Sequence, residues 1–279
     1  MVPAPALKRQ GRPHGARQGA AVKVTLIPSS VGPDSASVHP GFFLSSYLIE
    51  EAVAIDAGGL GFLGDLDAQS RIKHIFITHS HVDHIASLPI FLETVFESAD
   101  HCVTVHAGAE TWASIQGDIF NDRVWPDFIA LSEKGLPFVK KSIIEPGKPV
   151  VVEGLKLTPI SVDHVVPTLG FLIEGPGGTV AIPSDTGPTE DFWRHAAAAK
   201  ELKAVFLEVS FPDRMEGLAR ISKHLTPAMF AAEIRKLDAD VPVVAVHIKP
   251  RFYGEVVDQI LALGSDRIEV GRPGKSYTF

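Results

Sequence analysis

The chain has 279 residues, of which 45% are hydrophobic and 21% are charged, an ordinary composition for a folded globular enzyme. Its formal net charge of −7 argues against the large basic face that nucleic-acid binding demands. The single cysteine, Cys102, excludes an internal disulfide and a cysteine-based zinc cluster, and it suits a reducing compartment. Because no apolar run approaches the about 20 residues that span a bilayer, we expect a cytoplasmic protein without membrane contact.

Residues 1–20 contain Lys8, Arg9, Arg12 and Arg17 among scattered prolines and glycines, so we expect a flexible arm. We expect residues 21–279 to form a single domain. Apolar runs predict strands at 22–28, 43–49, 52–56, 72–78, 102–106, 149–152, 155–161, 169–174, 179–183, 203–209, 242–247 and 267–270. Helices are predicted at 83–98, 108–118, 189–199, 226–237 and 254–263. Clustered strands with helices outside them indicate an α/β fold of two sheets packed face to face and flanked by helices.

Two junctions carry clear local signals. Thr226 and Pro227 predict a helix start, because threonine caps a first turn and proline is tolerated within it. The glycine-rich stretch from Glu174 to Thr179 predicts a hairpin turn between two strands. Residues 119–148 are the least regular part of the chain, and we expect an insertion or lid over the site there.

The run His79-Ser80-His81-Val82-Asp83-His84 places three imidazoles and a carboxylate within six residues, directly after an apolar, strand-like run. Imidazole and carboxylate are the ligands that zinc and similar divalent ions prefer. A tight turn from a strand into a helix can direct His79 and His81 to one ion and Asp83 and His84 to a neighbour. A solvated polar loop would explain one or two histidines but not four ligands at this spacing.

This run resembles the signature of the metallo-β-lactamase fold, and further segments match that family in order from about residue 22 to the end. Ala54–Gly58 resembles its strand-end Asp-Gly, and His164, Asp185 and His247 fall where its later ligands are expected. The resemblance implies a four-layer αββα sandwich, in which two mixed β-sheets are flanked by helices.

The same resemblance implies two divalent metal ions, with Zn²⁺ as the first candidate and Mn²⁺ or Fe as alternatives. The first ion would be held by His79, His81 and His164, the second by Asp83, His84 and His247, and Asp185 would bridge the two. A hydroxide shared by the ions would then attack an ester. Asp56 would not be a ligand but would orient a ligand histidine through its other ring nitrogen.

Members of this family hydrolyse β-lactams, thioesters, sulfate esters and phosphodiesters, so the fold alone leaves the substrate open. Cys102 lies far from every ligand position, which excludes a lactamase type with a cysteine ligand. The segments Phe120–Phe128, Leu207–Pro212 with Ser222–Pro227, and His247–Pro250 are similar to class II 3′,5′-cyclic-nucleotide phosphodiesterases. Ser87 departs from that pattern, in which glycine is expected. The resemblance implies hydrolysis of cyclic AMP or cyclic GMP to the 5′-monophosphate.

In that reaction the leaving alkoxide needs a proton. His224, oriented by Glu208, is the candidate general acid, and Asp83 belongs to the catalytic set as well as to the ligands. His224 could instead bind phosphate or cap the next helix. Lys249 could hold a phosphate oxygen or face solvent. The residues expected to contact the substrate from the 119–148 segment are Trp125, Phe128 and Asn121, although the two aromatic residues could instead anchor that segment to the core.

Three rival functions remain open at this point. A tRNA 3′-end-processing endonuclease would need a basic arm, which neither the charge of −7 nor residues 119–148 supply. An arylsulfatase of the same fold would act on sulfate esters. A non-catalytic metal- or nucleotide-binding module is disfavoured by the complete ligand set. We expect a small nucleotide phosphodiester as the partner molecule, and the sheet edges are compatible with a homodimer.

Overall fold

The computed structural model describes residues 21–28, 44–96, 102–237 and 239–279. The predicted arm at 1–20 lies outside these ranges, as do residue 43 of one predicted strand and residues 97–98 of one predicted helix. Within the described ranges, no helix combines the length and apolar character that a membrane span requires.

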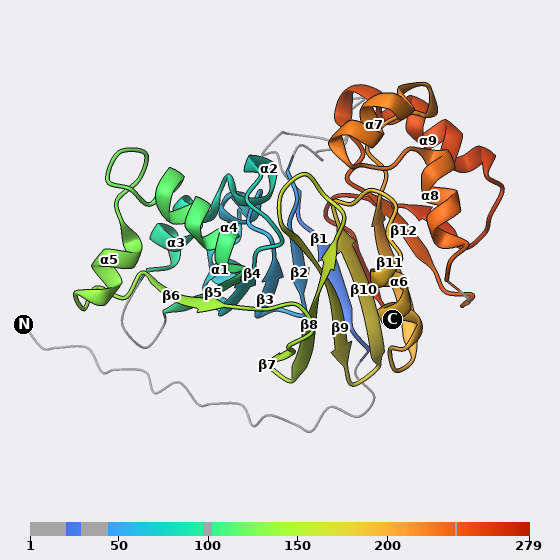
Figure 1. Cartoon of the computed structure of the whole chain (residues 1–279). Coiled ribbons are helices and arrows are strands. Elements are labelled where there is room, and N and C mark those ends of the chain that lie inside the picture. Colours follow the sequence, from blue (N-terminus) through green and yellow to red (C-terminus); the bar gives the residue numbers. More distant parts are fainter. Residues whose placement is uncertain (1–20, 29–43, 97–101, 238) are drawn as a thin grey trace, which may run out of the picture.

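Two seven-stranded sheets form the centre of the described structure (Figure 1). The first has the order β14-β1-β2-β3-β4-β5-β6 and comprises β1 (Lys23–Leu26), β2 (Tyr47–Ile49), β3 (Val53–Ile55), β4 (His74–Phe76), β5 (Val103–Ala107), β6 (Val139–Ile143) and β14 (Ser276–Thr278). Strands β3 to β6 pair in parallel, and the other pairs are antiparallel.

The second sheet has the order β13-β12-β11-β10-β9-β8-β7. Its members are β7 (Val150–Val152), β8 (Leu155–Val162), β9 (Thr168–Gly175), β10 (Gly178–Ser184), β11 (Leu202–Glu208), β12 (Val243–Val246) and β13 (Ile268–Val270). Strands β10 to β13 pair in parallel, whereas β7 to β10 pair antiparallel. Each sheet is therefore mixed.

Helices cover the outer face of each sheet (Figure 1). On the first sheet these are α1 (Leu66–Arg71), α2 (Val82–Ile85), α3 (Leu88–Val95), α4 (Ala109–Ser114) and α5 (Phe128–Glu133). On the second they are α6 (Asp191–Ala197), α7 (Glu216–Ser222), α8 (Pro227–Ile234) and α9 (Tyr253–Ala262). The arrangement is the αββα sandwich expected from the sequence, with two mixed sheets flanked by helices.

Alternation along the strands produces three layers of core. Ile55 and Phe206 lie in the core between the two sheets. Their sequence neighbours Ala54 and Val205 face outward and pack under the helices. Because central strands are buried on both faces, they read in the sequence as continuous apolar runs. This explains why apolar runs alone located most of the strands.

The structure differs from the sequence prediction where polar residues form regular elements. The single helix predicted at 83–98 is two helices, because the Ser87 backbone N–H donates to the Ala57 carbonyl at 3.0 Å instead of continuing the helical ladder. The edge strands β6 and β14 and the short helices α1, α5 and α7 were not predicted. Strand β6 exposes Lys140 and Lys141, a pattern that protects a sheet edge but hides the strand in the sequence.

Candidate metal centre

The carboxyl ends of strands from both sheets meet at one edge of the sandwich, and the predicted site residues follow them directly. Asp56 follows β3, and His79 lies three residues after β4 ends. Asp185 follows β10 and His247 follows β12, while His164 lies just beyond β8, which runs in the same direction. Segments far apart in the sequence thus converge because parallel strands deliver their carboxyl ends to one place.

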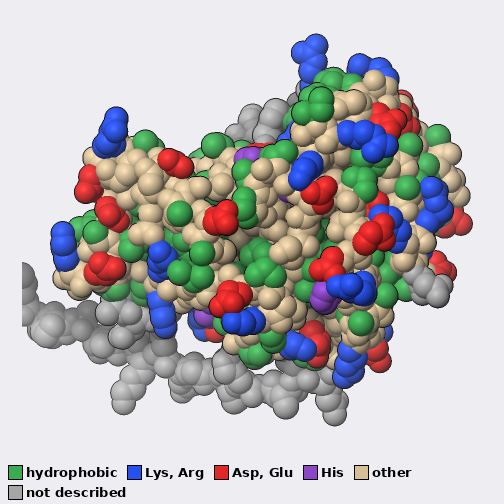
Figure 2. Space-filling model, in the orientation of Figure 1, with side chains coloured by type: hydrophobic (Ala, Val, Ile, Leu, Met, Phe, Trp, Pro, Cys, Tyr) green, Lys and Arg blue, Asp and Glu red, His purple; other side chains and the backbone are tan. Residues whose placement is uncertain are grey.

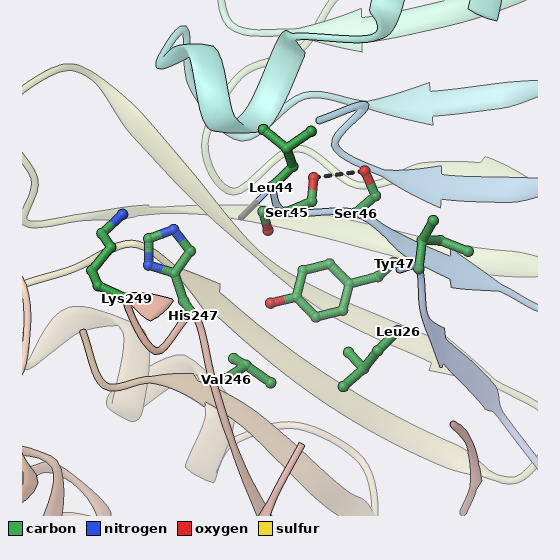
Figure 3. A pocket seen from close by; sticks show the side chains of 9 residues that line it. Leu26, Leu44, Ser45, Ser46, Tyr47, Val246, His247 and Lys249 are labelled. Atoms are coloured by element: carbon green, nitrogen blue, oxygen red, sulfur yellow. Dashed lines mark hydrogen bonds between the residues drawn. The ribbon is translucent and has the colours of Figure 1, made fainter. Parts of the chain in front are cut away.

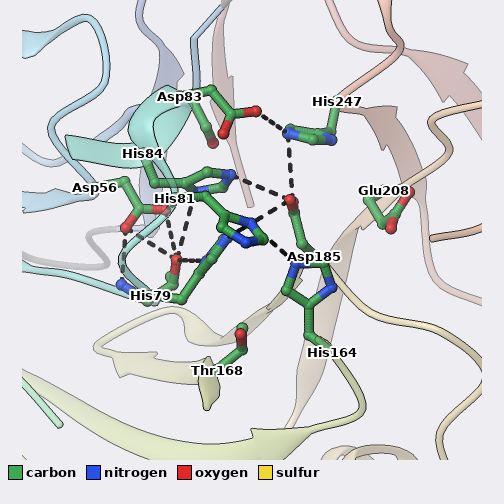
Figure 4. A network of polar contacts seen from close by, with 12 residues as sticks. Asp56, His79, His81, Asp83, His84, His164, Thr168, Asp185, Glu208 and His247 are labelled. Atoms are coloured by element: carbon green, nitrogen blue, oxygen red, sulfur yellow. Dashed lines mark hydrogen bonds and ion pairs between the residues drawn. The ribbon is translucent and has the colours of Figure 1, made fainter. Parts of the chain in front are cut away.

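A first cluster contains His79, His81, His164 and Asp185 (Figure 4). The Nδ1 atom of His81 lies 3.0 Å from His79 Nε2 and 3.2 Å from His164 Nε2. Asp185 Oδ2 lies 3.8 Å from His79 Nε2. Two imidazole nitrogens bound to one tetrahedral zinc would be about 3.4 Å apart, so this spacing suits a shared ion.

A second cluster contains Asp83, His84, Asp185 and His247. His247 Nε2 lies 3.3 Å from Asp83 Oδ2 and 3.4 Å from Asp185 Oδ1. His84 Nε2 lies 3.3 Å from Asp185 Oδ2. Asp185 belongs to both clusters and presents one oxygen to His247 and the other to His79 and His84, which is the geometry expected of a bridging carboxylate.

Hydrogen bonds on the far side of His164, His84 and His79 leave their inward nitrogens free to bind a metal. The His164 Nδ1–H donates to the Lys223 carbonyl at 3.1 Å, so Nε2 carries the lone pair. His84 Nδ1 lies 2.7 Å from Asp56 Oδ2. Asp56 also accepts from the Thr78 hydroxyl, whose oxygen lies 3.0 Å from His79 Nδ1. The contact predicted for Asp56 is therefore present, and it reaches two ligand histidines rather than one.

Burial and neighbouring charges shift the pKa values of the candidate ligand histidines in directions that favour a bound cation. Burial lowers the pKa of His79, His81 and His247 and lowers that of His164 to about 4, so these rings are neutral near pH 7. Burial would also lower the pKa of His84, but the carboxylates of Asp185 and Asp56 raise it well above its ordinary value. Two carboxylates thus favour a positive charge beside His84, whose Nε2 is buried without a hydrogen-bond partner. The donor set fits a pair of divalent ions.

Several site residues occupy a backbone conformation that side chains with a Cβ rarely adopt. Asp56, Ser184 and His247 have φ values of 60°, 63° and 60°, and Lys223 has a φ of 53°. Such left-handed residues cost on the order of 1–3 kcal/mol each and collect at functional sites. Three of them mark the point where a strand ends and a site residue turns inward. Gly58 is needed nearby, since a Cβ there would lie 2.0 Å from the Asp83 carbonyl oxygen.

Glu208 and His224 form a buried pair beside the two clusters. His224 Nδ1 lies 2.7 Å from Glu208 Oε1, and Glu208 is 1% exposed. The His224 ring centre lies 5.1 Å from that of His164 and 5.6 Å from that of His247. Burial would lower the pKa of His224, but the charge and hydrogen bond of Glu208 raise it. His224 therefore holds a proton within reach of the ligand histidines.

The residues predicted to contact substrate fall into different environments. Trp125 lines a cavity of about 480 Å³ that is also lined by Ser80 and Val82, which lie within the His79–His84 run. Phe128 does not line that cavity: it is 3% exposed and stacks on Phe120 and Phe138, so its assignment to substrate binding is corrected to a core role.

Asn121 is likewise a structural residue. Its side-chain oxygen accepts from the backbone N–H groups of Arg123 and Val124, and its amide donates to the Gly117 carbonyl. These bonds form the turn before Trp125 and engage the side-chain oxygen twice and the amide nitrogen once. Lys249 does lie at the metal clusters, with Nζ 3.1 Å from Asp83 Oδ2. Hydrogen bonds and charge from His247, with His84 and Lys249, outweigh burial and lower the pKa of Asp83.

A smaller cavity of about 30 Å³ lies beside His247 and Lys249 (Figure 3). Tyr47 lines it with Ser45 and Ser46, and its ring points toward His247. Burial and the charges of Asp185 and Asp56 raise the Tyr47 pKa, so the phenol stays protonated. The cavity has room for about one water molecule. Tyr47 was not predicted, because a tyrosine in an apolar strand carries no local signal of function.

The family model for the beta-lactamase superfamily domain matches residues 56–248, which include every predicted ligand. The chain belongs to the beta-lactamase superfamily. It is 29% identical over 252 residues to a probable 3′,5′-cyclic-nucleotide phosphodiesterase of Yersinia pestis, covering 81% of this chain and 71% of that protein. It is also 30% identical over 237 residues to a ribonuclease Z of Anoxybacillus flavithermus, covering 68% and 73%.

Among solved structures, unliganded yeast PDE1 superimposes with a TM-score of 0.74 at 16% sequence identity, over 93% of this chain and all of that one. This likeness establishes the shared fold. Membership of the superfamily and the two His/Asp clusters identify the chain as a hydrolase of the metallo-β-lactamase fold with a site for divalent metal.

Proposed function

We propose that this protein hydrolyses a phosphodiester, with 3′,5′-cyclic AMP or cyclic GMP as the substrate and the 5′-monophosphate as the product. The observation that carries the proposal is the pairing of two ligand clusters, joined by Asp185, with the buried Glu208–His224 pair. Sequence similarity to proteins that are named 3′,5′-cyclic-nucleotide phosphodiesterases supports this choice of ester within the superfamily.

Two divalent ions, when bound, would offset the charge of the phosphate and lower the pKa of water. The chain's own groups supply the rest. The Nδ1–H of His224 is committed to Glu208, which leaves Nε2 as the ring atom that can give a proton to the departing ribose oxygen. The raised pKa of His224 keeps that proton available near neutral pH. Lys249 is positioned to neutralise charge at the Asp83 side of the site.

We further propose that the cavity at Trp125 receives the nucleobase. Its lining is largely apolar and includes Val82, the first residue of α2, which is 71% exposed and lies between the candidate ligands His81 and Asp83. Ser80, Ser114 and Asp118 add polar groups to this lining. Stacking of a base on an aromatic side chain stabilises binding by about 1–3 kcal/mol. In the same proposal zinc occupies both metal positions, the protein is cytoplasmic, and the residues 119–148 act as a lid.

The second candidate function is cleavage of a tRNA precursor, which the 30% identity to a ribonuclease Z favours. The charge of −7 speaks against it. Figure 2 shows Lys and Arg side chains interspersed with Asp and Glu across the visible face. The third candidate function is hydrolysis of an aryl sulfate ester.

Parallel assays of the zinc-loaded protein with cyclic AMP, cyclic GMP, a precursor tRNA and an aryl sulfate test the proposal. We expect turnover of a cyclic nucleotide at the highest kcat/KM. Faster cleavage of the tRNA precursor or of the sulfate ester would replace the proposal with that function.

A further inference from the structure

Two buried carboxylates in this site, one from each sheet, make the same pattern of hydrogen bonds. Asp56 Oδ2 lies 2.7 Å from His84 Nδ1, and Asp56 also accepts from the Thr78 hydroxyl. Glu208 Oε1 lies 2.7 Å from His224 Nδ1, and Oε2 accepts from the Ser210 hydroxyl at 3.0 Å. Each carboxylate therefore contacts one histidine directly and one hydroxyl.

Each hydroxyl in turn contacts a second histidine. Thr78 Oγ1 lies 3.0 Å from His79 Nδ1. Ser210 Oγ lies 3.0 Å from His247 Nδ1. Thr78 and Ser210 are both fully buried, so water does not compete for these bonds. The same order, carboxylate to hydroxyl to ligand imidazole, thus occurs twice.

The single proton of the Ser210 hydroxyl decides the direction of these bonds. A bond to an ionised carboxylate is stronger than one to a neutral acceptor, so the hydroxyl donates to Glu208 rather than to the His247 carbonyl, which lies 3.2 Å away. The Ser210 oxygen then accepts from the His247 Nδ1–H. That tautomer leaves the Nε2 lone pair directed toward Asp83 and Asp185, 3.3 and 3.4 Å away.

We propose that Ser210 is a positioning residue that fixes the tautomer and ring orientation of His247 and thereby sets the affinity of the second cluster for its metal ion. Glu208 consequently serves two purposes: one oxygen orients His224, and the other acts on His247 through Ser210. Ser210 is the counterpart of Thr78, which acts on His79 in the first cluster. This inference rests on the proposed two-metal site.

The test measures metal binding and needs no substrate. Zinc is titrated into the metal-free full-length protein against a chelating dye, for the unchanged chain and for Ser210→Ala. We expect Ser210→Ala to bind the first zinc unchanged and the second about 10–100-fold more weakly, the range seen when a partner of a ligand histidine is removed. Two zinc ions bound with unchanged affinities in Ser210→Ala would overturn the inference.

Two further variants separate positioning from packing. Ser87→Ala removes another fully buried hydroxyl, which makes two hydrogen bonds away from the clusters, and it should leave both zinc affinities unchanged. Ser210→Thr keeps the hydroxyl and should restore the second affinity. Equal weakening by Ser87→Ala would show that loss of buried polar packing, not positioning of His247, is responsible.

A spectroscopic measurement covers the case in which Ser210→Thr does not fold. In metal-free protein labelled with ¹⁵N-histidine, the His247 signal should report a proton on Nδ1 in the unchanged chain and a loss of that preference in Ser210→Ala. An unchanged tautomer would overturn the inference. Failure of the proposed function is a separate result, since it would appear as two bound zinc ions without turnover of any phosphodiester.

Discussion

Replacing His224 with alanine should slow the release of a poor leaving group far more than that of a good one. His224 holds a proton through its 2.7 Å bond to Glu208, and that proton is needed only when the departing oxygen is a strongly basic alkoxide. Loss of a general acid slows turnover by about 10²–10⁴-fold, equivalent to roughly 3–5 kcal/mol in the activation barrier. For His224→Ala we expect this loss with cyclic AMP and less than about tenfold with bis-p-nitrophenyl phosphate, since nitrophenolate leaves without protonation.

The fold should survive this substitution. Glu208 keeps its contacts with the Ser210 hydroxyl and with the backbone N–H groups of Thr186 and Leu225. The assay is kcat for both substrates in zinc-loaded protein whose metal content has been measured. His195→Ala, at an exposed histidine on α6, is the matched control and should change neither rate. Equal losses with both substrates, or loss of zinc from His224→Ala, would refute the general-acid assignment.

Three other changes have defined outcomes. Asp185→Ala should reduce the zinc content below two ions per chain and abolish most activity, because Asp185 contributes to both clusters; a retained pair of ions, measured by elemental analysis, would remove it from the bridge. Trp125→Ala should raise KM for cyclic AMP more than for bis-p-nitrophenyl phosphate, and equal changes would place Trp125 in the scaffold. Burial lowers the pKa of His106 from 6.5 to about 4, so the folded state favours the neutral ring. This preference for the neutral ring raises the free energy of unfolding above pH 6.5 by roughly 3 kcal/mol relative to pH 4. The stabilisation is lost as the pH falls from 6.5 toward 4. In chelator-treated protein, urea unfolding of His106→Gln should therefore vary less between pH 7 and pH 4.5 than that of the unchanged chain, and identical pH dependences would contradict this assignment.

The candidate ligands could be named from sequence because the run from His79 to His84 and three later segments resemble one family in the same order. The structure adds the reason for their convergence: His79, Asp185 and His247 follow buried strands whose carboxyl ends meet at one edge of the sandwich. The contacts around them could not be predicted. Thr78 and Ser210 are common residue types at positions without any spacing signal, and their function depends on distances of 3.0 Å across the fold.

The 119–148 segment shows where residue type alone misleads. An aromatic residue in an irregular stretch can face a ligand or anchor the chain, and the sequence left this choice open for Phe128. The structure resolves it through stacking on Phe120 and Phe138. Asn121 was assigned to substrate as part of the segment that resembles the phosphodiesterases, but its amide closes a turn.

Ser87 shows the reverse case, in which a departure from the family pattern has a structural explanation. Its hydroxyl donates to the Ala57 carbonyl at 2.7 Å and accepts from the Gly61 N–H at 2.8 Å. These bonds connect the start of α3 to the loop that follows Asp56. The serine therefore packs these two segments together away from the metal clusters, and its presence does not weaken the relationship to the family.

The most direct test of the whole account is turnover of 3′,5′-cyclic AMP as a function of bound zinc. Metal-free protein should be inactive, and activity should rise to a plateau at two zinc ions per chain and disappear again with a chelator. Protein that holds two zinc ions yet converts neither cyclic AMP nor cyclic GMP would contradict the proposed function, and full activity with a single ion would contradict the two-metal site.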